Sequence, residues 1–89
     1  MYRISEANFK RIAESALGVL YEKFPLPLST TQVAAELARD NEFVLKVMLF
    51  LEKKGYAVRV GKGKLGDLSR TVKWKISKQA RETYEKHLG

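Results

Sequence analysis

The 89-residue sequence contains no cysteine, and this absence excludes several kinds of site. Without a thiol the chain has no disulfide framework, no thiolate metal centre and no cysteine nucleophile. Histidine is almost absent as well, since His87 is the only one. The sequence also offers no Ser/His/Asp set and no paired carboxylates placed for acid–base chemistry. We therefore expect no metal, no cofactor, no small-molecule substrate and no enzymatic activity.

Long apolar runs are missing too. No stretch approaches the roughly 18 apolar residues that a membrane span requires. The N-terminal segment MYRISEANFKRIAES has no apolar core of signal-peptide length. These features are typical of a cytoplasmic protein with no membrane partner. Hydrophobic residues nevertheless make up 45% of the chain, with four Phe, four Tyr and one Trp. This content is enough for the core of one small domain over residues 1–89.

Acidic residues are scarce in the C-terminal part of the chain. The formal net charge is +7. Residues 1–54 carry eight Lys/Arg against seven Asp/Glu, whereas residues 55–89 carry nine against three. An uneven basic excess of this kind favours contact with a polyanion such as nucleic acid.

The first half of the sequence predicts three helices. Ser5 can cap a helix over residues 5–24, in which apolar residues recur at helical spacing, and the two prolines of the segment FPLPL end it. In LSTTQVAAEL, Ser29 and Gln32 have the spacing of a capping box, which predicts a helix over residues 30–38. After a tight turn, Asp40 is the expected N-cap of a third helix over residues 41–54.

The period of the apolar residues changes from helical to alternating after Gly55, the expected end of the third helix. YAVRV and TVKWKI predict two strands, over residues 56–60 and 71–76, joined as a hairpin. Ser77 then caps a last helix over residues 78–88.

The apolar side chains of both strands must face one core, and this requirement predicts the register of the hairpin. The expected pairs are Val60 with Val72, Val58 with Trp74, and Tyr56 with Ile76, and Trp74 is expected in the core. This register places Arg59 opposite Lys73, with Lys75 nearby on the exposed face. Like charges facing each other indicate an anion against that face. The alternative is that the charged strands protect the sheet from aggregation.

The segment GKGKLG, residues 61–66, matches the G-x-G-x-x-G spacing of nucleotide-binding loops. A dinucleotide site needs a helix after the glycines, but DLSRTVKWKI is strand-like. A kinase loop needs a downstream catalytic loop, for which the sequence has no counterpart. A P-loop needs Ser or Thr after its lysine, whereas Leu65 follows Lys64. We therefore interpret the glycines as the flexible backbone of a hairpin tip.

The order of these elements resembles a winged helix-turn-helix domain. LSTTQVAAEL is similar to the second helix of small winged-helix regulators, and VLKVMLFLEKKGYAVRV to their third helix running into the first wing strand. WKISKQARETYEKHL is similar to the exit of MarR-like regulators, although Ala80 replaces their usual glycine. The resemblance implies a mainly α-helical α+β fold with a three-helix bundle, a two-stranded β-hairpin wing and a C-terminal helix.

In domains of this type the third helix enters the major groove and the wing contacts the DNA backbone or the minor groove. The resemblance therefore implies a transcriptional regulator whose partner is double-stranded DNA. Val44, Met48 and Leu51 would face the core of the domain. The residues expected to contact DNA are Thr30, Thr31, Asn41, Glu42, Lys46, Arg59, Lys62, Lys64, Arg70, Lys73 and Lys75.

Leu45 and Leu49 are expected on the same outward face of the third helix, and they leave two functions open. They could contact thymine methyl groups, or they could form the interface of a protein-interaction module in a larger replication or transcription assembly. Tyr84 and Leu88 are candidates for packing the last helix on the first, or for a homodimer interface. RNA is a third candidate partner, because a basic winged helix can accept an A-form backbone.

Overall fold

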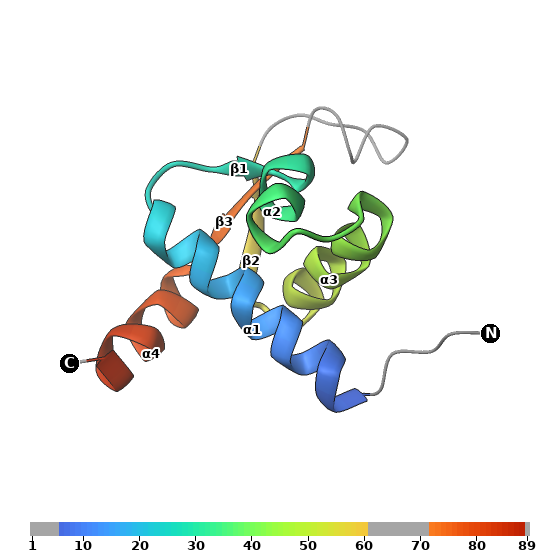
Figure 1. Cartoon of the computed structure of the whole chain (residues 1–89). Helices are drawn as coiled ribbons and strands as arrows, with labels where there is room; N and C mark the ends of the chain where they lie inside the picture. The colour runs from blue at the N-terminus through green and yellow to red at the C-terminus, as the bar shows by residue number, and fades with distance from the viewer. Residues whose placement is uncertain (1–5, 61–71, 89) are drawn as a thin grey trace.

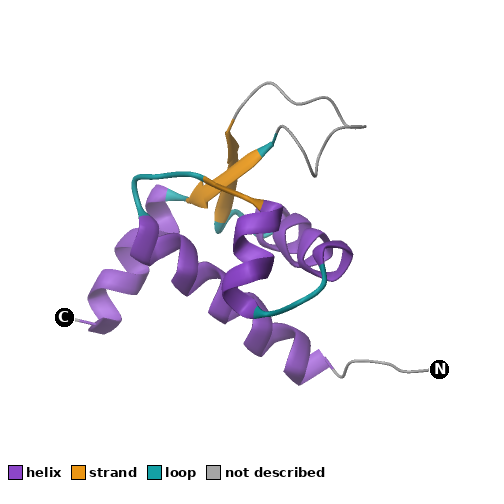
Figure 2. Cartoon of the chain, turned by 45° about the horizontal axis from the view of Figure 1, so that its top comes forward, coloured by secondary structure: helices purple, strands orange, loops and turns teal. Residues whose placement is uncertain are grey.

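The computed structural model describes residues 6–60 and 72–88, which form four helices and a three-stranded antiparallel sheet (Figure 1). In chain order the elements are α1 (Glu6–Lys23), β1 (Leu28–Ser29), α2 (Thr30–Leu37), α3 (Asn41–Lys53), β2 (Ala57–Val60), β3 (Lys73–Ile76) and α4 (Lys78–Leu88). The strand order is β1-β3-β2, so the strand that comes last in the chain is central. Figure 2 shows the loop that leads from α1 into β1 at the edge of this sheet.

Side-chain caps fix where α2 and α3 begin. The Gln32 amide donates to Ser29 Oγ over 3.1 Å, and the Ser29 amide donates to Gln32 Oε1 over 2.9 Å. The predicted capping box is therefore confirmed. Asp40 Oδ2 accepts from the Phe43 amide over 3.1 Å, so Asp40 is the N-cap of α3 as expected. Gly55 follows the C-cap of α3 with a φ of 82°, a left-handed conformation that glycine adopts without strain.

The turn between α2 and α3 depends on a left-handed residue that is not glycine. Ala38, at the C-cap of α2, has φ 55° and ψ 46°, and its amide donates to carbonyls of the last turn. Left-handed backbone brings the alanine Cβ close to the following carbonyl oxygen. The turn is tight because only Arg39 separates Ala38 from the cap of α3.

We expect Ala38→Gly to stabilise the fold by about 0.5–1 kcal/mol, because it relieves this strain at a C-cap position. Urea unfolding followed by far-UV circular dichroism measures the change. The matched control is Ala35→Gly. Ala35 is exposed but lies inside α2, so this change should destabilise the fold by about 1 kcal/mol. Equal destabilisation by both variants would contradict the argument.

The core lies between α1, α2, α3 and the inner face of the sheet. Val44, Val47 and Met48 of α3 are fully buried and Leu51 is 2% exposed, which confirms the core positions expected for this helix and adds Val47. Trp74 is also fully buried, as predicted. Its indole Nε1 donates to Thr30 Oγ1 over 2.9 Å, and this hydrogen bond joins β3 to the first residue of α2.

The predicted register of the hairpin is wrong by one residue. The observed pairs are Ala57 with Ile76, Val58 with Lys75, Arg59 with Trp74, and Val60 with Lys73. The inner face of β2 therefore carries Ala57, which is 2% exposed, and Arg59, whose guanidinium lies 5.4 Å from the Trp74 ring centroid. Val58 turns outward. The alternation in YAVRV predicted the wrong inward face. Alanine is small enough for the close-packed core, and arginine has an apolar stem that covers an aromatic ring.

Helix α4 begins after Ser77, whose Oγ accepts from the Ala80 amide over 3.1 Å, so the predicted cap is confirmed. Tyr84 packs on Tyr21 of α1 with ring centroids 4.7 Å apart. Gly18 makes room for this contact, because a Cβ there would lie 2.8 Å from the Tyr84 hydroxyl oxygen. Tyr84 thus joins the last helix to the first, one of its two expected roles.

Candidate nucleic-acid interface

The N-terminal ends of α2 and α3 lie next to each other. Asn41 Nδ2 donates to Thr31 Oγ1 over 3.2 Å, and both side chains are exposed. Thr30, in contrast, is fully buried beneath this end of α2 and accepts the hydrogen bond from Trp74. The structure therefore removes Thr30 from the predicted phosphate contacts, because no part of it reaches the surface, and it leaves Thr31 beside Asn41.

The outward side of α3 is polar at its N-terminal end and apolar further along. Asn41, Glu42 and Lys46 are exposed. Leu45 and Leu49 pack against the core and are half-buried, so the expectation that both are exposed is wrong. The reason is that α3 packs closely against the bundle, so that more than one stripe of the surface of α3 is covered.

Arg59 is held inside the fold by a carboxylate of α3. Its Nε donates to Glu52 Oε2 over 3.0 Å and its Nη2 donates to Glu52 Oε1 over 2.7 Å. The two side chains are 25% and 31% exposed. Such a two-bonded pair is stronger and more directional than a single surface ion pair. Arg59 therefore joins β2 to the last turns of α3, and it does not face Lys73 as the predicted register required.

The two lysines of β3 lie on the outer face of the sheet, since they alternate with buried Trp74 and Ile76. Lys73 is exposed and lies between Val60 on β2 and Ser29 on β1. Lys75 is half-buried, and its Nζ lies 6.0 Å from the ring centroid of Phe24. The other predicted wing contacts, Lys62, Lys64 and Arg70, lie outside the described residues, as does the side chain of Leu88.

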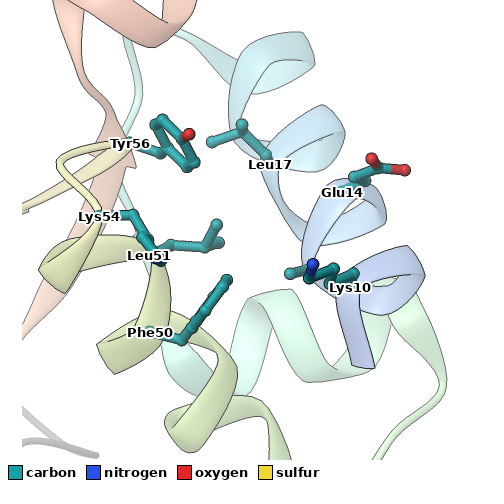
Figure 3. A pocket seen from close by; sticks show the side chains of 8 residues that line it. Lys10, Glu14, Leu17, Phe50, Leu51, Lys54 and Tyr56 are labelled. Atoms are coloured by element: carbon teal, nitrogen blue, oxygen red, sulfur yellow. The ribbon is translucent and has the colours of Figure 1, made fainter. Parts of the chain in front are cut away.

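A groove along α1 is the feature that the sequence did not predict. One hollow of about 290 Å³ lies between α1 and α3, and a neighbouring one of about 480 Å³ lies between α1 and α4. They share Glu14, Leu17 and Tyr56. Figure 3 shows Leu17 and Lys10 of α1 across the first hollow from Tyr56, Leu51 and Phe50. Tyr84 lines the second. The sequence signals for this surface were Leu17, spaced one helical turn from core residues of α1, and Tyr84, a candidate interface residue.

Neither a metal site nor a membrane span is found in the described part of the chain. Residues 6–60 and 72–88 contain no group of three or more His, Cys, Asp or Glu side chains arranged to hold a metal ion. Within the same ranges, none of the helices combines the length and apolar character needed to cross a bilayer.

Solved structures that superpose on this chain include those of two bacterial proteins, ZitR and MepR. A double mutant of Lactococcus lactis ZitR in its apo form superposes with a TM-score of 0.70 at 20% identity, over 92% of this chain and 58% of that one. A Staphylococcus aureus MepR–DNA complex gives 0.64 at 19% identity, over 92% of this chain and 54% of that one. The chain has a winged helix-turn-helix fold. The resemblance drawn from the sequence is thus confirmed for the fold.

This winged-helix chain spans between half and three fifths of the length of the structures it matches. A further example is a single mutant of Lactococcus lactis ZitR in complex with DNA, with a TM-score of 0.65 and 19% identity, over 99% of this chain and 57% of that one. No protein-family model matches the sequence, and no curated protein matches it either.

Proposed function

We propose that this winged-helix protein binds double-stranded DNA and regulates transcription as a cytoplasmic, DNA-associated protein without catalytic activity. The observation that carries the proposal is the exposed polar corner formed by Thr31, Asn41, Glu42 and Lys46 at the start of α2 and α3. Asparagine and lysine can donate to base edges in the major groove, and a glutamate can accept from cytosine N4. Structures of the same fold include a MepR–DNA and a ZitR–DNA complex, which supports duplex DNA as the partner.

The basic hairpin supplies the phosphate contacts in this proposal. Lys62, Lys64, Arg70 and Lys73 would neutralise backbone phosphates and position the protein without reading sequence. We assign Arg59 a supporting role, because its guanidinium is bound by Glu52 and lies over Trp74. It would hold the base of the wing against α3. Thr31 would meet a phosphate at the start of α2, where backbone amides and the helix dipole favour an anion.

Fluorescence anisotropy with a random-sequence DNA duplex at two salt concentrations tests the proposal. We expect tight binding at low salt and a log–log salt slope of about −0.9 for each phosphate neutralised. Binding that is absent, or that does not respond to salt, would refute it. An RNA duplex of the same length at the same salt is the comparison: preference for the RNA would replace DNA as the partner.

A homodimer is the second part of the proposal. The groove along α1 exposes apolar surface of Leu17 and Tyr84, and both partners of a two-fold pair would bury it. Light scattering measures the mass of the free protein, which should be close to twice 10.2 kDa. A Leu17→Glu variant should return the mass to that of one chain. A wild-type protein that is monomeric at all concentrations would remove this part alone.

A further inference from the structure

A mixed apolar and basic surface lies where the end of α1, the outer face of the sheet and the start of α4 meet. We call Phe24, Val58, Lys75 and Arg81 the Phe24 patch. Among the described residues the exposed large hydrophobic side chains are Leu26 at 66%, Tyr56 at 41%, Val58 at 39% and Phe24 at 38%, and two of these four belong to the patch. Lys75 pairs with Val58 across the strands, so their side chains share the outer face of the sheet.

Two cations converge on the Phe24 ring. The Arg81 guanidinium lies 4.7 Å from the ring centroid and the Lys75 ammonium lies 6.0 Å from it. Arg81 also donates to Glu85 over 3.2 Å. The ring therefore has two cationic neighbours, while more than a third of the residue remains in contact with solvent.

Interactions within the fold account for the positions of Lys75 and Arg81 but not for the exposure of the apolar side chains. Lys75 and Arg81 lie near the C-terminal end of α1, where the helix dipole favours positive charge, and cation–π contact with Phe24 adds to this. Neither effect requires Phe24 and Val58 to remain uncovered. Apolar side chains gathered around basic ones form a surface suited to a partner that supplies both apolar contact and negative charge.

Duplex DNA fits this surface poorly. A phosphate backbone supplies the negative charge but leaves the exposed aromatic and aliphatic side chains without apolar partners. Figure 1 also shows α4 and the end of α1 on the opposite side of the molecule from α3, whose N-terminal end carries the proposed base contacts. A second copy of this chain fits poorly as well, because a two-fold contact would bring the cations of one patch against those of the other.

We propose that the Phe24 patch is a docking surface for an acidic protein segment in which carboxylates flank aromatic or aliphatic side chains. The apolar side chains of the segment pack against Phe24 and Val58. Its carboxylates meet Lys75 and Arg81, whose positions beside the ring place positive charge at the edge of the apolar contact. A winged-helix protein with this surface could hold a second protein on the side remote from α3.

The test uses a short fluorescein-labelled peptide of repeated Asp-Phe-Asp-Leu units and the full 89-residue chain. Anisotropy should show saturable binding that weakens when Ser replaces Phe and Leu in the peptide, and also when Asn replaces Asp. Phe24→Ser in the protein should weaken binding about 10-fold and Arg81→Gln about 5-fold, the range usual for single contacts at an interface centre and rim. Arg81→Lys should keep most of the affinity.

The matched control is Arg11→Gln, which removes one charge from an exposed position of α1. It should leave peptide affinity within about twofold of wild type, because an isolated surface charge contributes little. Equal loss in Arg11→Gln and Arg81→Gln, or equal binding of the Ser-substituted peptide, would reduce the interaction to net charge and overturn the proposal. So would the absence of peptide binding to the wild-type chain.

Parallel measurements keep this proposal separate from DNA binding and dimerisation. Duplex affinity should be unchanged in Phe24→Ser, and a fall as large as the peptide's would assign the patch to the DNA surface instead. A light-scattering mass that falls in Phe24→Ser would assign it to self-association. Thermal unfolding of each variant shows whether the fold is intact. If Phe24→Ser unfolds, Arg81→Gln decides the outcome, because Arg81 is half-buried on α4 and does not belong to the hydrophobic core.

Discussion

Changing Lys62, Lys64 and Arg70 together to alanine is expected to lower the affinity for any DNA duplex by about two to three orders of magnitude near 0.1 M salt. Each lost phosphate contact removes about 0.9 from the log–log salt slope, so the slope should become shallower by about 2.7. The loss should be similar for every sequence, because phosphate contacts position a protein without specifying bases. Anisotropy titrations over a series of salt concentrations give both quantities.

A second triple variant controls for the loss of net charge. Arg11, Lys23 and Lys53 are exposed residues of α1 and α3. Changing all three to alanine lowers the net charge by the same amount, but away from the hairpin. Losing long-range attraction alone should weaken DNA binding only a few-fold, because charges beyond about 10 Å are screened at this salt. If the two triple variants lose affinity equally, Lys62, Lys64 and Arg70 do not contact the DNA directly and act only through net charge.

The second large effect concerns stability. Trp74→Phe is expected to lower the free energy of unfolding by about 2–4 kcal/mol, because it leaves a gap in the core and orphans the Thr30 hydroxyl. Thr30→Val should cost about 1–3 kcal/mol, since the indole N–H is then buried without an acceptor. The free energies come from urea unfolding followed by far-UV circular dichroism, which does not depend on tryptophan.

The double variant tests whether the hydrogen bond couples the two sites. Trp74→Phe with Thr30→Val should be less destabilising than the sum of the single changes, because each one already removes the bond. Thr83→Val is the control. It also removes a hydroxyl that makes a hydrogen bond, to the Gln79 carbonyl, but on the exposed face of α4. It should change stability by no more than about 0.5 kcal/mol, and strict additivity at Trp74 and Thr30 would contradict the coupling.

Features that depend on a few consecutive residues were predictable from the sequence. The Ser29–Gln32 capping box and the Asp40 cap each join residues three apart, so their hydrogen bonds follow from local spacing. The core face of α3 was predictable for the same reason, because helical periodicity separates Val44, Met48 and Leu51 from the polar positions.

Features that depend on distant residues were not predictable. Thr30 reads as an exposed first residue of a helix, but its partner Trp74 lies 44 residues further along the chain. Strand β1 has two residues, too few to show a periodicity, so it can be recognised only by its pairing with β3. In YAVRV both alternating faces contain apolar residues. Only the presence of Glu52 and Trp74 around Arg59 decides which face turns inward.

The central position of β3 has a consequence for cooperativity. Leu28 pairs with Trp74 and Ala57 pairs with Ile76, so one strand closes two loops of very different length. The entire segment that holds α2 and α3 lies between Ser29 and its partner Lys73. Separating β3 from the sheet would therefore release the start of α2 and the stem of the wing in the same event. Amide hydrogens of α2 and β2 should then exchange with solvent through a common opening, as parts of one cooperative unit.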